Sequence, residues 1–220
     1  MNKHLKYCRL IICFLLAMFL LHSCGKNNQP TYMPITDQIL KDAVTVKVGS
    51  YFIYQDSATG KLDSFNVTDF LQYDLPISYD NTTNESLSYR AECTNNNTGQ
   101  CKNFAIGALR NRIGFGYHYD NMNLEALLMK LPFASGSQQS YYEGPKAGTA
   151  TSLRHYDSYS VLGRYYNDIY EMKSDYFNQI GLYNIELHTW FSTSSGLIKF
   201  SISDSSRRFS YSLIRSKIIK

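Results

Sequence analysis

The chain has 220 residues, with 22 Lys and Arg against 18 Asp and Glu, which gives a formal net charge of +4. Charged residues make up only 18% of the chain and aromatic residues 15%, with 19 tyrosines among them. This composition excludes a disordered acidic or basic tail and a charged coiled coil, and the length fits one domain or at most two small ones.

The N-terminus has the pattern of an export signal. Three basic residues precede an unbroken apolar run from Leu10 to Leu21. As a helix this run would span about 18 Å, well short of the ~30 Å hydrocarbon core of a bilayer. A basic start, a short apolar stretch and a small residue at the exit are the parts of a secretory signal peptide. The exit, Leu21-His22-Ser23-Cys24-Gly25, resembles the lipobox of bacterial lipoproteins, in which the Cys is lipidated and becomes the new N-terminus.

The sequence therefore predicts a lipoprotein signal peptide over residues 1–23, a lipidated Cys24 with a flexible tether over 24–34, and one domain over 35–220. Each buried CH₂ of the acyl chains, such as palmitate, contributes ~0.8 kcal/mol, so the lipid would hold the protein firmly on a membrane. Surface-exported lipoproteins of Bacteroidota often carry an acidic cluster after the lipidated Cys, and this chain has none. By that resemblance we expect the outer membrane, with the periplasmic face favoured over the cell surface.

Removal of the signal changes the charge and the cysteine count. The three basic residues before the apolar run leave with it, so 19 basic residues then face 18 acidic ones. This near-neutral balance argues against nucleic acid as a partner. Cys93 and Cys101 remain as a pair in an oxidising compartment, and we predict a disulfide between them. Two thiols without a nearby His or a second pair do not indicate a metal site, and no cofactor is predicted.

The mature chain begins with a helix signal and continues with strand signals. Thr36 is a candidate N-cap for a short helix that ends at Ala43. The segment Val44–Asp56 is rich in β-branched and aromatic residues, and Leu62–Phe70 follows it after a turn that contains Gly. The two segments predict a β-hairpin.

Alternating patterns continue to the C-terminus. Gly114 and Gly116 fall on one face of a predicted strand, which indicates close approach by another element or sharp curvature. Residues 121–131 fit a short helix or a buried strand equally well. The further predicted strands are Ser86–Cys93, Lys102–Leu109, Arg112–Tyr119, Leu153–Val161, Tyr165–Ser174, Leu182–Phe191, Gly196–Ser203 and Arg207–Lys217. The pattern predicts a mainly β fold: a single antiparallel meander of about ten strands, curved into a sandwich or half-open barrel, with one or two short helices.

Several short motifs resemble a group of Bacteroidota outer-membrane lipoproteins that has no agreed activity. Gly49–Tyr54 followed by Asp63–Val67 is similar to the opening motif of that group, and Leu131-Pro132-Phe133 is similar to a mid-chain motif. Gly163–Ile169 and Trp190–Phe200 are similar to a later strand and to the closing segment. These motifs mark strands and turns, so the resemblance implies an antiparallel β fold and membrane tethering and supplies no catalytic residue.

Motifs for catalysis are sparse in the sequence. His118, His155 and His188 have no partners at metal-ligand spacing, and the sequence contains neither a nucleophile elbow nor a phosphate-binding glycine loop. Acids that are distant in sequence can still meet across a β cleft, as in glycosidases. The candidate carboxylates are Asp157, Asp168, Glu171 and Glu186.

Two further signals point to surface chemistry. Asp56-Ser57-Ala58 resembles the short O-glycosylation motif of Bacteroidota and falls in a predicted turn, which makes Ser57 a candidate glycan site. Aromatic residues gather in the second half of the chain, and a Tyr ring suits sugar stacking or a partner surface. The alternative interpretation is a two-faced strand filled with good β-formers. The candidate ligand-binding residues are Tyr156, Tyr159, Tyr165, Tyr166 and Trp190.

The sequence thus favours a non-enzymatic, membrane-anchored lipoprotein of the cell envelope. Its β domain would bind a lipid or other hydrophobic molecule, a glycan or an envelope protein. An apolar barrel interior would favour a hydrophobic ligand, and an exposed groove of tyrosines would favour a glycan. The alternative function is a carboxylate-dependent glycan hydrolase of the envelope, which requires the candidate acids to converge in a cleft.

Overall fold

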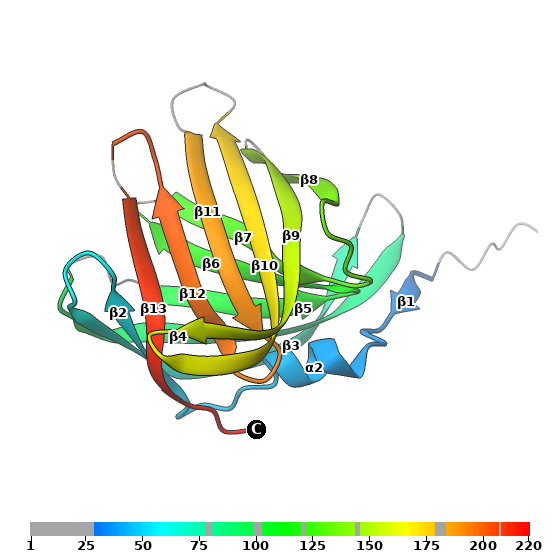
Figure 1. Cartoon of the computed structure of the whole chain (residues 1–220). Coiled ribbons are helices and arrows are strands. Elements are labelled where there is room, and N and C mark those ends of the chain that lie inside the picture. The colour runs from blue at the N-terminus through cyan, green and yellow to red at the C-terminus, as the bar shows by residue number, and fades with distance from the viewer. Residues whose placement is uncertain are drawn as a thin grey trace, which may run out of the picture.

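The chain folds into one curled β-sheet with a single short helix among the residues that the structure describes (Figure 1). This is a computed structural model, and it describes residues 29–77, 81–98, 103–119, 122–143, 146–178, 184–206 and 208–220. The predicted fold class is confirmed, since the sheet is almost entirely antiparallel and curls into a half-barrel. Within the described ranges, no helix is long and apolar enough to span a membrane.

The described elements have the following bounds. The helix is α2, Gln38–Val44. The strands are β1 (Thr31–Met33), β2 (Tyr51–Asp56), β3 (Leu62–Ile77), β4 (Thr82–Asn96), β5 (Asn103–Leu109), β6 (Arg112–Tyr119), β7 (Met122–Lys130), β8 (Gln138–Glu143), β9 (Lys146–Val161), β10 (Arg164–Asn178), β11 (Asn184–Ser192), β12 (Gly196–Ser203) and β13 (Arg208–Lys217).

Two meanders share the sheet. Strands β2 to β7 pair in chain order, strands β8 to β13 do the same, and β13 pairs antiparallel with β2 to join the two halves. Strands β7 and β8 are therefore the ends of the strand order, while β1 pairs in parallel with β4. The sheet curls so far that the green strands of the first meander cross behind the yellow and orange strands of the second (Figure 1). As a result β7 contacts β9, β10 and β11, and Leu127 packs with Ala150 and Met172.

Several element boundaries differ from the sequence predictions. The helix is capped by Asp37 in place of Thr36, because the Asp37 carboxylate accepts a hydrogen bond from the Ile39 backbone N–H at 2.9 Å. The strand predicted from residue 44 starts only at Tyr51, since the helix extends through Val44 and a turn with Gly49 at φ +91° follows. Residues 122–130 form a strand, because they pair along the whole of β6.

Aromatic rings fill the inside of the curl. Phe104 is 1% exposed, and its ring centroid lies 5.0 Å from that of Phe65 and 5.9 Å from those of Phe52 and Phe115. The second meander contributes Phe200, whose ring lies 5.6 Å from that of Phe115. Contacts at these distances are typical of aromatic pairs in protein cores. The enclosed space is thus occupied by the side chains of the protein itself, and the two halves interlock there.

The aromatic packing makes Phe104 a critical core residue. We expect Phe104→Ala to lower the free energy of unfolding by about 3–5 kcal/mol, because the cavity it leaves borders several rings that cannot all relax into it. Denaturant unfolding followed by circular dichroism measures this change. As a control, Tyr165→Ala removes a ring that is 79% exposed, and it should change the same free energy by no more than about 0.5 kcal/mol. Equal stability of the two variants would contradict the described core.

Candidate functional site

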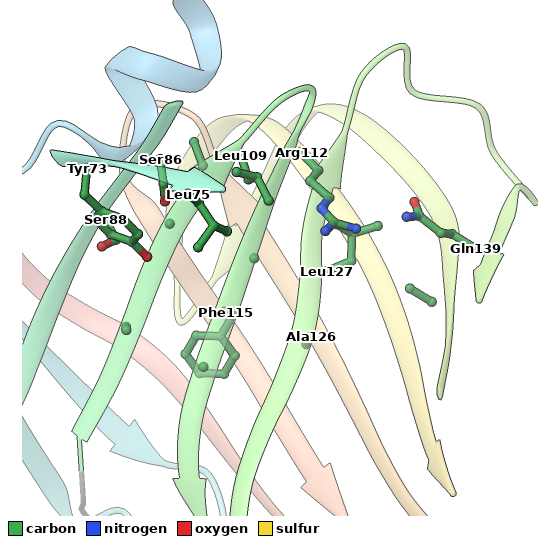
Figure 2. A pocket seen from close by; sticks show the side chains of 16 residues that line it. Tyr73, Leu75, Ser86, Ser88, Leu109, Arg112, Phe115, Ala126, Leu127 and Gln139 are labelled. Atoms are coloured by element: carbon green, nitrogen blue, oxygen red, sulfur yellow. The ribbon is translucent and has the colours of Figure 1, made fainter. Parts of the chain in front are cut away.

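A cleft of about 380 Å³ lies beside β4–β7 (Figure 2). It is on the opposite side of these strands from the aromatic core, since its Ala105 and Gly107 alternate along β5 with the buried core residues Phe104 and Ile106. Ligand pockets of proteins typically measure about 300–1,000 Å³. Strands of both meanders contribute to the cleft, because Gln139 of β8 and Ala150 of β9 belong to its lining. Its lining residues are Tyr73, Leu75, Ser86, Ser88, Ala105, Gly107, Ala108, Leu109, Arg112, Gly114, Phe115, Gly116, Ala126, Leu127, Gln139 and Ala150.

Small residues form the floor of the cleft. Strands β5 and β6 place Ala105 opposite Gly116 and Gly107 opposite Gly114. A Cβ atom built on Gly116 would have no neighbour within 4 Å, and one on Gly114 would meet only the Ala126 carbonyl oxygen, at 3.6 Å. The sequence pattern predicted close approach of another element or sharp curvature at these two glycines. Above Gly116 the structure has open space, so no element approaches closely there. The pairing of β6 with β7 shifts register between Ile113 and Gly114, an irregularity that accompanies local curvature.

Apolar side chains form most of the walls. Leu75 of β3, Leu109 of β5 and Leu127 of β7 are arranged around the hollow (Figure 2). Ser86 and Ser88 of β4 add two hydroxyl groups on the β3 side. A mostly apolar lining with a few placed polar groups is typical of sites for small organic molecules.

One end of the cleft is polar. Arg112 of β6 and Gln139 of β8 lie on opposite sides of it (Figure 2). The Gln139 Oε1 atom is buried, and no described residue donates a hydrogen bond to it. A second hollow of about 260 Å³ adjoins this end and shares Leu109, Arg112 and Gln139 with the first. Its other lining residues are Ile77, Asn84, Arg110, Asn111 and Lys130.

The aromatic residues predicted to bind a ligand lie elsewhere, on β9–β11. The rings of Tyr156 and Tyr159 have centroids 5.0 Å apart, and Tyr159 stacks on Trp190 at 6.5 Å. Trp190 is only 7% exposed, so this group packs against itself. Tyr165 stands apart and exposed, and Tyr166 donates its hydroxyl hydrogen bond to a backbone carbonyl of β13. None of these five residues lines either hollow.

Beside this aromatic group lies a polar network. The Glu171 carboxylate accepts a hydrogen bond from the Tyr156 hydroxyl at 2.6 Å and lies 2.9 Å from His188 Nε2. The His188 ring stacks on Trp190 at 4.0 Å, and Lys199 Nζ lies 4.5 Å above the same Trp. Burial lowers the pKa of His188 from its ordinary value; the Lys199 charge also lowers it, and these effects outweigh the opposing influence of Glu171 and of Glu186.

The four candidate catalytic acids have separate surroundings. Asp168 lies 2.7 Å from His155 Nε2, and Glu186 lies 2.8 Å from Lys173 Nζ. Asp157 is exposed, and Glu171 belongs to the network with His188. None of the four lines either hollow. In the described part of the chain, no group of three or more His, Cys, Asp or Glu side chains could hold a metal ion.

The predicted modification sites are only partly covered by the described residues. Ser57 is exposed in the turn between β2 and β3, where its backbone N–H donates to the Ser210 carbonyl at 2.8 Å. Cys93 lies in β4. Cys24 and Cys101 lie outside the described residues, so the lipidation and the disulfide stay predictions.

Comparison with known proteins adds little to this geometry. No protein-family model matches the chain, and no curated protein matches its sequence. A solved structure with a similar shape is the 2.70 Å crystal structure of a protein provisionally described as a lipoprotein from Parabacteroides distasonis. The two share 10% sequence identity at a TM-score of 0.43, over 80% of this chain and 98% of that one. Inference about function therefore rests on this chain's own residues.

The half-buried His188 predicts a pH-dependent stability. Because its pKa is lower in the folded protein than the ~6.5 of an unfolded chain, the unfolded state binds this proton more readily. The free energy of unfolding should therefore fall as the pH drops from about 8 through 6.5, and the loss should be complete below the folded-state pKa.

Unfolding of wild type and His188→Gln at several pH values between about 5 and 8 checks this expectation. At about pH 8 the ring is almost entirely neutral in both states, so any difference between the two proteins there is independent of the proton. Below that pH the wild type should lose more stability than the variant. Parallel pH profiles would show that His188 does not carry the effect.

Proposed function

We propose that this chain is a lipid-anchored lipoprotein of the cell envelope whose β domain binds an apolar molecule in the cleft beside β4–β7. The observation that carries the proposal is the cleft itself. Its floor consists of Ala105, Gly107, Gly114 and Gly116, and leucine side chains line its sides. Apolar area removed from water contributes about 25 cal/mol per Å². A cleft with this mostly apolar lining suits a hydrocarbon chain, which gains most from such burial.

The other candidate locations are already occupied by contacts within the chain. The inside of the curled sheet is packed with rings such as Phe104 and Phe200. In the aromatic group on which a sugar would stack, Trp190 is buried, and its ring also contacts His188 and Lys199. The open and mostly apolar surface is the cleft, which favours a hydrophobic ligand over a glycan.

The glycines of the cleft floor also support the proposal that a ligand binds there. Glycine inside a strand costs roughly 0.5–1 kcal/mol relative to Ala, because the unfolded chain is more flexible and the strand gains no side-chain packing. Neither Gly114 nor Gly116 has a positive φ, and a Cβ atom would fit at both positions. The fold therefore does not require glycine at these two places. Keeping the surface hollow gives a physical reason for both.

The proposed anchor rests on the N-terminal sequence. The apolar run and Leu21-His22-Ser23-Cys24 support lipidation of Cys24, and the proposed location is the periplasmic face of the outer membrane. The first strand, β1, begins at Thr31 and pairs with β4. The domain would thus stand close to the membrane surface, on a spacer of a few residues.

Two smaller modifications are part of the proposal. A disulfide between Cys93 and Cys101 would pin the connection from β4 to β5, which is consistent with an oxidising envelope compartment. An O-linked glycan on Ser57 is supported by the exposure of this residue in the turn between β2 and β3. Both lie apart from the cleft lining.

Lipidation predicts a specific chemical label. Cells grown with an alkyne analogue of palmitate should incorporate it into the wild-type protein and not into Cys24→Ala, because the thiol is the attachment point. The full chain is isolated and the label is detected after coupling to a fluorophore. Cys93→Ala is the matched control and should keep the label. Equal labelling of Cys24→Ala and wild type would contradict the anchor.

The cleft predicts the loss of ligand binding in Gly116→Val. No atom lies within 4 Å of a Cβ at this position, so the new side chain should fill part of the cleft without disturbing the strand. Val is also a better β-former than Gly. The overlap with a ligand should weaken binding by about 1–3 kcal/mol, which corresponds to about 5- to 150-fold.

The probe is a palmitoyl alcohol with a photoactivatable diazirine in its chain, added to the full-length protein in a sugar-headed detergent. After illumination, mass spectrometry locates the labelled peptides. Wild type should be labelled within β5–β7 and Gly116→Val much less, while Asn66→Val, a substitution at an exposed position of β3, should behave like wild type. Labelling that is spread over other strands, or that survives in Gly116→Val, would overturn the proposed site.

A further inference from the structure

We infer that the molecule bound in the cleft carries an anionic head group, held by Arg112 and Lys130 at the polar end. This inference rests on the proposed function and adds the chemistry of the ligand's head to that of its tail. The occupant it assigns is an amphiphile with an acyl chain and a carboxylate or phosphate group.

The first observation is a pair of like charges. Arg112 of β6 and Lys130 of β7 are directly opposite each other in the antiparallel register. Like charges at such positions repel each other and destabilise a sheet. Both residues line the smaller hollow. Arg110 lines it too, but its guanidinium already donates hydrogen bonds to Asn84 and Thr82 and is not assigned to the head group. The sheet therefore concentrates positive charge at the end of the apolar cleft.

The second observation is that no acid among the described residues pairs with Arg112 or with Lys130. Neither hollow has a carboxylate in its described lining. Arg112 and Lys130 take part in none of the ion pairs or side-chain hydrogen bonds seen between described residues. The acids that do form ion pairs are bound to other partners: Glu85, Asp168, Glu171, Asp175 and Glu186.

The third observation is the continuity of the two hollows. Leu109, Arg112 and Gln139 line both, so a chain lying over the glycine floor would bring its end group next to the Arg112 guanidinium. Guanidinium binds carboxylate and phosphate groups through two parallel hydrogen bonds, which is the geometry in which it is strongest. The buried Gln139 Oε1, which has no donor among the described residues, could accept a hydrogen bond from a hydroxyl of the same head group.

The test compares probes that differ only in the head group. Three diazirine probes with the same palmitoyl chain are used: the free acid, a lysophosphatidate and the neutral alcohol. Wild-type full-length protein should be labelled within β5–β7 more strongly by the acid or the lysophosphatidate than by the alcohol, and the better of the two identifies the source of the anion. Arg112→Gln should lower this preference about tenfold, the factor expected for the loss of one charge-assisted hydrogen bond.

Controls separate charge recognition from folding. Arg112→Lys keeps the charge and should retain part of the preference, while Lys217→Gln removes an equal charge from the far end of β13 and should leave it unchanged. Without ligand, Arg112→Gln should unfold at the same temperature as wild type or a higher one, because the repulsion with Lys130 is relieved. A residue needed for the fold would give the opposite result.

The outcomes distinguish the two proposals. If wild type is labelled in the cleft equally by the anionic probes and the alcohol, the head-group inference is wrong and the apolar site stands. If Arg112→Gln and Lys217→Gln lower the preference equally, a general charge effect replaces the specific site. If no probe labels β5–β7, both proposals fail.

Discussion

The pairing of β13 with β2 is the contact on which the rest of the structure depends. It joins the last strand of the second meander to the first strand of the first meander, with Tyr211 opposite Asp56 and Lys217 opposite Tyr51. Closing so long a loop costs chain entropy before any contact compensates for it. The compensation comes from the ring core and from two buried hydrogen bonds between the halves, from the Tyr54 hydroxyl to the Leu197 carbonyl and from the Tyr211 hydroxyl to Asp63.

The candidate cleft is a consequence of that closure. Once the halves are joined and the sheet curls, β7 meets β10, and Leu127 packs with Ala150 and Met172. This contact brings β8 and β9 alongside the far face of β5 and β6. The first meander then supplies the floor and one wall of the cleft, and the second meander supplies Gln139 and Ala150 opposite. Neither half could form the cleft alone.

The sequence predicts the strands well and the cleft poorly, and the reason is physical. Alternation is local, so β6 and β12 coincide with the predicted segments, and even the unusual glycines at 114 and 116 are visible as a pattern. The cleft depends on a long-range curl that alternation does not encode, so the pattern gave no sign that Gln139 would face Arg112. The predicted aromatic ligand residues lie outside the cleft, since tyrosine suits a buried contact as well as a ligand surface, and Trp190 is buried.

The features that weaken this fold gather in one place. They lie along the cleft and the hollow that adjoins it. They are glycine in two strand positions that would accept a side chain, like charges across a strand pair, and a buried amide oxygen without a donor among the described residues. Sequences tend to be consistent with their folds at every level, and departures concentrate where function requires them. An acyl chain would cover the floor, and an anion would compensate the charge of Arg112 and Lys130. Such a ligand would offset, in a single binding event, several of these local costs.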